Sequence, residues 1–503
     1  MHQSREKIFQ CPVHGYITIP VDYVSNFLDT AIFQRLRYIE QTSIQSLYPS
    51  AHHNRFVHSI GVFHLARIAF DNIVKNTTPD ILEGVDLNHY RIPFEIAALM
   101  HDCAHAPFSH TCENYYEGKQ VKDFSERTDG AAPATPATHV DHEHATNLLL
   151  SLASSDPSFR ADYAALKLAL KVPKPHEIFS SAIFLKHFSG EFATLTSKSP
   201  VLVARMITGC VHNYASTIEK QIENCLISLI NGSTIDVDKL DYIMRDVFVS
   251  GVNGVNIDAN RLLSSLTLQK YDHHLEAVYN KSALSCIQSV VNGRNFLSYW
   301  IHTHHTVAYF NTLLKKKIKE MLHHFSPEDN PTLLEQTIFS EECFSEPVTA
   351  NGHTFFLPTD GDVLSLLKKM AKDDDEIIEL LSRSPRRIPL WKTRAEYENM
   401  LRDKNASQRA RVFSSIERIL GDVLPEEAMD HVCKVEATHT MQFFALDDLY
   451  INVRGTKMSF STAVPELRRS DPRSSFFFYV YIPKTHIDLK NDCIDAIQQY
   501  HPY

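Results

Sequence analysis

The chain has 503 residues and a mass of 57.4 kDa, with 44% hydrophobic and 22% charged residues. This balance is typical of a globular protein and excludes a fibrous or low-complexity chain. The 50 basic and 60 acidic residues give a net charge of −10, which excludes a basic surface for non-specific duplex binding and makes nucleic acid an unexpected partner. The 28 histidines favour a metal site or an acid–base site, without locating it.

The cysteines and the apolar runs indicate the cellular environment. None of the nine cysteines has C-x-x-C spacing, so we expect reduced thiols rather than a zinc-thiolate site or a redox pair. The first seven residues are polar and charged, and no run approaches the roughly 18 apolar residues of a membrane span. We therefore expect a soluble, intracellular (cytoplasmic) protein without a signal peptide.

The first 325 residues show mostly helical periodicity. The pattern predicts helices through residues 56–69, 148–152 and 222–230, and one long helix over residues 290–314 because no Gly or Pro follows Gly293. Residues 117–138 are rich in polar residues, Ala and Pro, and have little apolar surface to bury. They are predicted to form a mobile loop.

The pattern changes beyond residue 325. Residues 326–331 are a polar linker, and residues 362–381 are predicted to form an amphipathic helix. Residues 440–446, 450–454 and 474–482 are rich in aromatic and β-branched residues and are predicted strands. We expect a mainly α fold, in which a helical core (1–325) precedes a smaller α+β lobe (326–503) with a regulatory or oligomerisation role.

The most informative segment is HDCAHAPFSH at residues 101–110. At a helix end, the adjacent His101 and Asp102 can converge on one ion, and His105 follows four residues later on the same helical face. Pro107 is expected to break the helix, with His110 just after the break. Three imidazoles and a carboxylate within ten residues favour a metal or acid–base site.

Two distant segments add residues of similar chemistry. They are HNRFVH at 53–58 and DVDKLDY at 236–242, in which Asp238 and Tyr242 are one helical turn apart. A single histidine is more often a surface residue or a satisfied core residue than a ligand. The combination over three separated segments predicts one shared site.

These motifs resemble those of the HD superfamily of metal-dependent phosphohydrolases. Within that superfamily they are most similar to the dNTP triphosphohydrolases, which include mammalian SAM-and-HD-domain enzymes and bacterial relatives. The resemblance covers about residues 7–310 and also rests on CPVHGYI at 11–17, LDTAIFQRLRYIEQ at 28–41, DHEH at 141–144 and IDVDKLDYIMRD at 235–246. No SAM domain is expected, because the motifs that match the family begin at the extreme N-terminus.

The resemblance implies a helical HD domain that binds one divalent transition metal, which would be Fe, Mn, Zn or a similar ion. Its ligands would be His58, His101, Asp102 and Asp238. Such mixed nitrogen and oxygen ligands suit these ions better than Mg²⁺ alone, and we expect Mg²⁺ to accompany the substrate triphosphate. The ion would polarise a phosphoryl oxygen and lower the pKa of a bound water.

The resemblance also implies the catalytic and substrate-binding residues. His105, His110 and His142 would line the phosphates; His110 would be the general acid for the leaving 5′-oxygen, and Glu113 would orient the proton transfer. The residues that would bind the substrate are Gln41, Arg55, Lys239, Tyr242, Asp246, Arg294 and His302. Structural alternatives remain open: Arg55 could be a solvated charge, Lys239 could pair with Asp236 or Asp241, and Tyr242 could be a core residue.

Three positions depart from the family pattern. The family has Asp at position 113, and it uses a Leu at position 42 and a Tyr at position 302 to exclude a ribose 2′-hydroxyl. This chain has Glu113, Thr42 and His302. Since a hydroxyl and an imidazole can hydrogen-bond a 2′-hydroxyl, strict selectivity for deoxynucleotides is not expected.

The resemblance further implies a regulatory nucleotide site for an activator of the GTP or dGTP type. Lys7, Asp29, Gln34 and Arg37 match positions that bind guanine nucleotides in allosteric members, and Lys392 could reach a phosphate. Occupation of this site could couple to assembly into a homo-oligomer, a dimer or tetramer. The structural alternative is an amphipathic helix whose Arg and Gln residues face water.

The activity we expect is metal-dependent hydrolysis of a (deoxy)nucleoside triphosphate to a nucleoside and inorganic triphosphate. Two alternatives stay open. An HD phosphodiesterase or nucleotidase would use the same metal site on other nucleotides, and a catalytically silent protein would only sense nucleotides. The identity of the product separates these alternatives.

Overall fold

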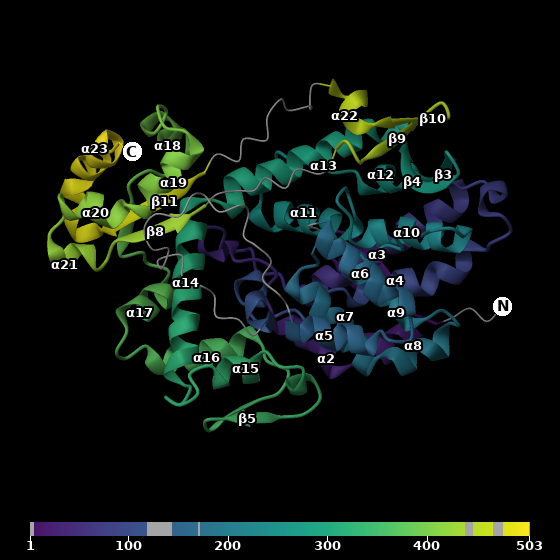
Figure 1. Cartoon of the computed structure of the whole chain (residues 1–503), viewed down its shortest axis with the longest axis horizontal. Coiled ribbons are helices and arrows are strands. Elements are labelled where there is room, and N and C mark those ends of the chain that lie inside the picture. Colours follow the sequence, from purple (N-terminus) through teal and green to yellow (C-terminus); the bar gives the residue numbers. More distant parts are fainter. Residues whose placement is uncertain (1–4, 118–142, 170–171, 438–445, 466–475, 502–503) are drawn as a thin grey trace.

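Helices dominate the computed structural model, which describes residues 5–117, 143–169, 172–437, 446–465 and 476–501. The purple-to-teal part of the chain forms a larger helical body, and most of the green and yellow part forms a smaller one beside it (Figure 1). This arrangement confirms the predicted mainly α fold with a small α+β lobe. Of the helices described, none combines the length and the apolar character needed to cross a bilayer.

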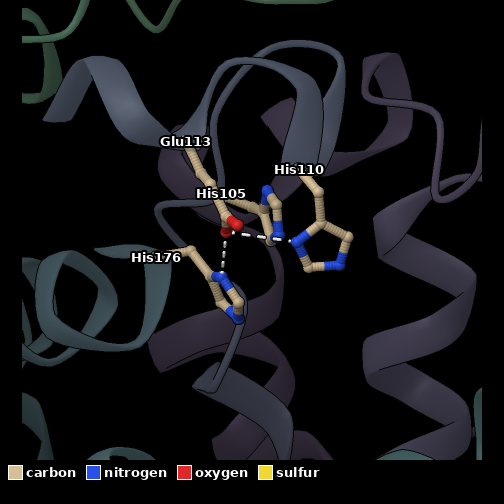
Figure 2. A group of neighbouring side chains, drawn as sticks. All are labelled: His105, His110, Glu113 and His176. Carbon is tan, nitrogen blue, oxygen red and sulfur yellow. Dashed lines mark hydrogen bonds and ion pairs between the residues drawn. The ribbon is translucent and has the colours of Figure 1, made fainter. Parts of the chain in front are cut away.

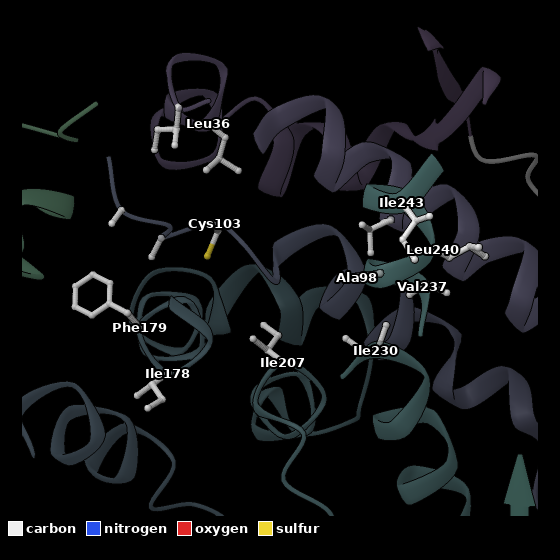
Figure 3. Close-up of a cluster of buried hydrophobic side chains, with 14 of the residues drawn as sticks. Leu36, Ala98, Cys103, Ile178, Phe179, Ile207, Ile230, Val237, Leu240 and Ile243 are labelled. Carbon is white, nitrogen blue, oxygen red and sulfur yellow. The ribbon is translucent and has the colours of Figure 1, made fainter. Parts of the chain in front are cut away.

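The larger body is a stack of helices around α3, which packs against α4 and α11. Its helices are α1 (Val21–Tyr23), α2 (Ala31–Gln34), α3 (Arg55–Asn76), α4 (Arg91–Met100), α5 (Glu143–Leu152), α6 (Pro157–Leu168), α7 (Pro175–His187), α8 (Ser189–Leu195), α9 (Pro200–Thr208), α10 (Ile218–Ile230), α11 (Val237–Ser250), α12 (Ala259–Ser264) and α13 (Leu284–Phe296). Buried Ala98 of α4, Ile207 of α9 and Leu240 of α11 lie in the shared core (Figure 3). This core fixes the positions of the ends of α3, α4 and α11, where the polar residues of the predicted site lie.

Capping residues define where α3 and α11 begin. The side chain of Asn54 accepts a hydrogen bond from the amide of Val57 at the start of α3, and Asp236 accepts one from the amide of Lys239 at the start of α11. These caps satisfy amides that have no partner within the helix.

Strands from distant parts of the chain share one sheet. The order β10-β9-β4-β3 brings together β3 (Leu266–Tyr271), β4 (His274–Asn280), β9 (Tyr450–Val453) and β10 (Thr456–Ser459). The pairing of β9 with β4 is parallel, with Ile451 opposite Tyr279, and the other pairings are antiparallel. Thus a segment far beyond residue 325 completes a sheet of the larger body. A separate antiparallel hairpin joins β1 (Glu6–Cys11) to β2 (Gly15–Pro20).

The smaller body surrounds a sheet of order β7-β11-β8, formed by β7 (Arg387–Pro389), β8 (Cys433–Glu436) and β11 (Phe478–Pro483). A short hairpin joins β5 (Val348–Ala350) to β6 (His353–Phe355). Its helices are α14 (His305–His324), α15 (Leu333–Ile338), α16 (Asp360–Met370), α17 (Asp375–Ser382), α18 (Arg394–Met400), α19 (Ala406–Ser414), α20 (Ile416–Gly421), α21 (Glu426–Met429) and α23 (Lys490–Gln499). Helix α22 (Phe460–Ala463) instead packs against β9 and β10 of the larger body (Figure 1). The predicted strands at 450–454 and 474–482 correspond to β9 and β11, whereas residues 440–446 fall almost entirely outside the described residues, as does the predicted loop at 117–138 apart from Glu117.

Three helix predictions are wrong in extent. Residues 290–314 are not one helix, because α13 passes into π-helical turns at Leu297–His302 and α14 begins after His304, whose side chain accepts a hydrogen bond from the amide of Thr306. Residues 362–381 are divided into α16 and α17, where Asp374 caps α17. Helix α4 ends at Met100, so His105 is not on its face and Pro107 does not end it.

Candidate functional site

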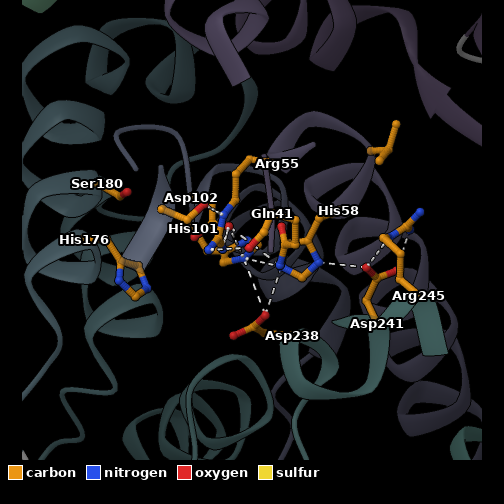
Figure 4. A network of polar contacts seen from close by, with 12 residues as sticks. Gln41, Arg55, His58, His101, Asp102, His176, Ser180, Asp238, Asp241 and Arg245 are labelled. Carbon is orange, nitrogen blue, oxygen red and sulfur yellow. Dashed lines mark hydrogen bonds and ion pairs between the residues drawn. The ribbon is translucent and has the colours of Figure 1, made fainter. Parts of the chain in front are cut away.

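Four side chains from three helix ends meet in one place, which we call the His–Asp cluster: His58, His101, Asp102 and Asp238. His58 lies in the first turns of α3, Asp238 lies in the first turn of α11, and His101 and Asp102 directly follow α4. Nε2 of His58 is 3.0 Å from Oδ1 of Asp238 and 3.3 Å from Nε2 of His101. Oδ2 of Asp102 lies 3.5 Å from Nε2 of His101 and 3.8 Å from Nε2 of His58 (Figure 4).

The two imidazoles are oriented by hydrogen bonds on their other ring nitrogens. Nδ1 of His101 donates to the carbonyl oxygen of Ala98 at 2.9 Å, and Nδ1 of His58 donates to Oδ2 of Asp241 at 2.7 Å. Both Nε2 atoms therefore face the carboxylates of the cluster. Such outer hydrogen bonds set the tautomer and the ring orientation of histidine ligands.

Asp241 is the most constrained carboxylate around the cluster. It is fully buried, and besides His58 it contacts Nε2 of His14 at 2.5 Å and the guanidinium of Arg245 at 2.8 Å. Gly61 leaves the room it needs, because a Cβ at that position would lie 2.0 Å from Oδ1 of Asp241. The positive groups around it hold the pKa of Asp241 well below its usual range despite its burial.

The charge balance of the His–Asp cluster favours a cation. Burial alone would lower the pKa of His58, but its hydrogen bonds to Asp238 and Asp241 outweigh burial and raise the pKa to about 9. The cluster thus attracts positive charge at the Nε2 atom that faces it. His58, His101 and Asp238 place their ligand atoms within reach of one ion, and Asp102 lies beside both imidazoles. This mixed nitrogen and oxygen donor set fits one divalent transition metal ion.

A second group, which we call the three-histidine cluster, consists of His105, His110, His176 and Glu113. Nδ1 of His110 is 3.1 Å from Oε2 of Glu113, and Nδ1 of His176 is 2.6 Å from the same oxygen (Figure 2). The rings of His105 and His176 stack with their centroids 4.4 Å apart. His105 and His110 follow α4 in sequence, whereas His176 comes from the first turn of α7.

His176 was missed by the sequence analysis. Its only local signal is its place after Pro175 at a helix start, which resembles many helix beginnings. The third imidazole predicted for the phosphates, His142, lies outside the described residues.

The electrostatics of the three-histidine cluster differ from those of the His–Asp cluster. Burial, the nearby Arg55 and the neighbouring imidazoles hold the pKa of His105 well below its usual range. The pKa of His110 is also lowered, because desolvation in the pocket outweighs the attraction of Glu113. The imidazoles of His110 and His176 keep the pKa of Glu113 below its usual range despite burial, so an ionised carboxylate contacts both rings.

A pocket of about 350 Å³ is lined by residues of both clusters. It brings together predicted residues from five segments, namely Gln41, Thr42, Arg55, Asp102, His110, Asp238, Lys239, Tyr242, Asp246, Arg294 and His302. Lys174, which the sequence analysis did not predict, also lines it. The pocket therefore carries four cationic side chains beside the carboxylates, a pattern suited to a polyanion with a bound cation.

Several pocket residues are held by protein contacts. Nη1 of Arg55 donates to Oδ2 of Asp102 at 2.7 Å, and the side chain of Arg55 is buried, so it is not a solvated charge. Lys239 donates to Asp236 and to the carbonyl oxygen of Gly232, as the structural alternative for Lys239 anticipated. Tyr242 is partly buried in the pocket wall, and burial raises its pKa to about 12.

Asp246 lies between two imidazoles. Oδ1 of Asp246 is 3.0 Å from Nε2 of His53, and Oδ2 is 2.9 Å from Nε2 of His302. The hydrogen bonds and charges of these imidazoles lower the pKa of Asp246 despite its burial. His302 is thus oriented by Asp246 in the pocket wall.

The residues predicted for a regulatory site lie on the surface. Nζ of Lys7 is 3.3 Å from Oδ2 of Asp29, and Nε of Arg37 donates to Oε1 of Gln34 at 2.7 Å. Lys392 is exposed just before α18, where its backbone amide donates to Glu396. The segment 28–39 is not one amphipathic helix, because α2 is followed by a 3₁₀ turn at Arg35–Tyr38.

Comparisons with known proteins find relatives over parts of the chain. A SAMHD1 homolog of Dictyostelium discoideum, described as a deoxynucleoside triphosphate triphosphohydrolase, is 42% identical over 116 residues, which are 23% of this chain and 22% of that protein. A putative HD domain-containing protein of Acanthamoeba polyphaga mimivirus is 25% identical over 324 residues, 62% of this chain and 58% of that protein. The chain therefore matches less than two thirds of the length of either relative.

A solved structure extends the similarity to the fold. A hypothetical protein from Aquifex aeolicus matches 98% of this chain and all of its own length, with a TM-score of 0.57 and 19% identity. No family model matches the chain. The relatives confirm the resemblance that the motifs predicted: the chain is similar to the HD-superfamily dNTP triphosphohydrolases.

Proposed function

We propose that this protein is a metal-dependent phosphohydrolase that cleaves (deoxy)nucleoside triphosphates between the 5′-oxygen and the α-phosphorus. The products would be a nucleoside and inorganic triphosphate. The observation that carries the proposal is the convergence of His58, His101, Asp102 and Asp238 beside a pocket lined with cationic side chains. The names of the relatives support the same class of reaction.

The His–Asp cluster would hold the metal ion. When bound, a divalent ion supplies Lewis acidity toward a phosphoryl oxygen and lowers the pKa of a water molecule. Asp241 would keep Nε2 of His58 directed at the ion, and Ala98 would do the same for His101 through its carbonyl oxygen. Arg55, bonded to Asp102, would fix the carboxylate while its charge faces the pocket.

The remaining side chains would bind the triphosphate and supply a proton. Arg55, Lys174, Lys239 and Arg294 line the pocket and would balance the phosphate charge. Nδ1 of His110 bonds Glu113, so a protonated ring would carry its second N–H on Nε2, and that proton would go to the leaving 5′-oxygen.

The proposal includes regulation by a nucleotide. Lys7, Asp29, Gln34 and Arg37 form exposed polar pairs that a guanine nucleotide would rearrange, together with Lys392. A GTP or dGTP activator acting through a homo-oligomer would then increase turnover. An activator that binds both states equally would have no effect on turnover.

The test is chromatographic product analysis of the purified protein with each NTP and dNTP, with Mn²⁺ or Mg²⁺, and with or without GTP. Release of nucleoside together with inorganic triphosphate supports the proposal. Nucleoside monophosphate or orthophosphate as the product would instead indicate an HD phosphodiesterase or nucleotidase. Nucleotide binding without any product would indicate a silent sensor. The comparison of NTP with dNTP hydrolysis decides whether a site with Thr42 and His302 accepts a substrate that carries a 2′-hydroxyl.

A further inference from the structure

The loop that follows α4 carries two imidazoles of the three-histidine cluster and has an unusual backbone. Phe108 and Ser109 have φ values of 56° and 52°, directly before His110. Neither residue is glycine, and a left-handed conformation is unfavourable for residues that carry a Cβ. Two such residues in succession persist only where the surrounding structure holds them.

A carboxylate from the C-terminal part of the chain holds this turn. Asp360, the first residue of α16, is 9% exposed. Its Oδ1 accepts a hydrogen bond from the amide of Phe108 at 2.5 Å, and its Oδ2 accepts one from the amide of Glu40 at 2.9 Å. Both amides belong to other segments, so these hydrogen bonds do not cap α16. The capping box of α16 is made by Thr359 and Asp362.

The same segments are joined a second time by a buried guanidinium. Nε of Arg35 donates to the carbonyl oxygen of Pro358 at 2.7 Å, and its Nη2 donates to the carbonyl oxygen of His105 at 2.6 Å. Arg35 is 3% exposed. The backbone is therefore tied to residues 358–360 both before the strained turn, at His105, and within it, at Phe108.

The contacts of Ser109 extend this linkage to the His–Asp cluster. Its hydroxyl donates to the carbonyl oxygen of Glu40, the residue whose amide donates to Asp360. Nε of Arg55 donates to the same hydroxyl at 3.0 Å, while Nη1 of Arg55 donates to Asp102. A connected set of hydrogen bonds thus runs from Asp360 through the turn to a residue of the His–Asp cluster.

We propose that Asp360 is a positioning residue that holds the turn at Phe108 and Ser109, and with it the imidazoles of His105 and His110, in the geometry needed for turnover. The catalytic part of this inference rests on the proposed function. Asp360 reaches the active site only through the backbone, so it is not a catalytic residue. It gives residues 358–360, beyond the predicted core, a role in the site.

The chemistry of the contact explains why a carboxylate is needed. Two amides donate to two separate oxygens, and an asparagine offers only one oxygen, so its amino group would face one of the donors. Burial raises the pKa of Asp360 to about 6, against the two backbone hydrogen bonds, so the ionised form that accepts from both amides prevails at neutral pH.

The test compares Asp360→Asn with Asp362→Asn in the full-length, metal-loaded protein. Asp362 caps the same helix and makes its hydrogen bonds with Thr359, so its variant controls for damage to α16. The first readout is hydrogen–deuterium exchange of peptides covering residues 101–112. We expect faster exchange in Asp360→Asn and unchanged exchange in Asp362→Asn. Equal exchange in the two variants would overturn the proposal.

The second readout separates positioning from folding. With Asp360→Asn we expect a fall in kcat of about 100-fold, because small displacements of reacting groups have effects of this size, with KM and metal content little changed. Asp360→Glu keeps both acceptor oxygens and should recover part of the rate; it also serves if the asparagine variant does not fold. Faster exchange with an unchanged kcat would exclude the catalytic role. If the wild-type protein releases no triphosphate, the proposed function fails, while the exchange experiment still tests the contact.

Discussion

The two histidine clusters of the pocket use similar residues in opposite electrostatic settings. In the His–Asp cluster, Asp102, Asp238 and the outer Asp241 surround two imidazoles, and the pKa of His58 is raised to about 9. In the three-histidine cluster a single carboxylate, Glu113, contacts two of the three imidazoles, and the pKa of the third, His105, is lowered beside Arg55. The ligand atoms of either cluster lie close enough to hold an ion, and we assign the metal to the first cluster and phosphate contacts with proton transfer to the second. The number of carboxylates per imidazole, more than the count of histidines, therefore distinguishes the two roles.

The largest expected effect is the loss of the His–Asp cluster. His101→Ala should remove the bound metal and lower turnover by more than about 1,000-fold, about 4 kcal/mol of barrier, while the helical circular dichroism stays unchanged. Metal content is measured by plasma mass spectrometry. His144→Ala is the matched control, since His144 is exposed, pairs with Glu341 and belongs to neither cluster. Full activity in a metal-free His101→Ala protein would refute the assignment.

A variant of the other cluster should separate chemistry from metal binding. His110→Ala should lower kcat by about 100- to 10,000-fold, as expected for the loss of a general acid, with the metal content unchanged. His176→Gln, which removes a ring nitrogen facing Glu113, should have a smaller effect in the same direction. If either variant loses its metal, the two clusters do not have the separate roles that we assign.

The two clusters should also contribute to folding stability with opposite dependences on pH. In metal-stripped protein the raised pKa of His58 favours folding by about 3 kcal/mol below its ordinary pKa of 6.5, and this contribution is lost as the pH rises through about 9. The lowered pKa of His105 has the opposite sign: its contribution is present above 6.5 and is lost as the pH falls.

Urea unfolding as a function of pH checks these signs. His58→Gln should flatten the dependence between pH 6.5 and 9, and His105→Gln should flatten it on the acid side of 6.5. Curves that match the wild-type protein over both ranges would contradict the electrostatic contrast.

The smallest expected effect concerns the outer carboxylate. Asp241→Asn keeps the shape of the side chain but weakens its hold on His58, so metal affinity should fall about 10- to 100-fold. Turnover should recover when more metal is added, which a simple loss of folding would not allow. Asp258→Asn, at the N-cap of α12, is a control of the same chemistry at a distance from the pocket. An unchanged metal dissociation constant would show that Asp241 does not position His58.

Much of the His–Asp cluster could be predicted from short sequence motifs. The three motifs predict one shared site, and the resemblance implies its four ligands. The structure brings His58, His101, Asp102 and Asp238 together because each motif lies at a helix end and the three ends meet. The helical period also predicted the mainly α fold. Helix ends were less predictable, since α4 stops at Met100, one residue before the motif, and leaves His105 in a different cluster from His101.

The amino-acid sequence by itself determined the local patterns, because helical periodicity, capping residues and motifs are properties of short segments. Only the tertiary structure decided which histidines belong to which cluster, including that His176 completes the three-histidine cluster. It also decided that Asp241 and Asp360 hold groups that are far away in the sequence. The physical reason is that these contacts depend on burial and on hydrogen bonds between distant segments. No local spacing encodes them, because a buried carboxylate is recognised only when the amides and imidazoles it must satisfy are in place.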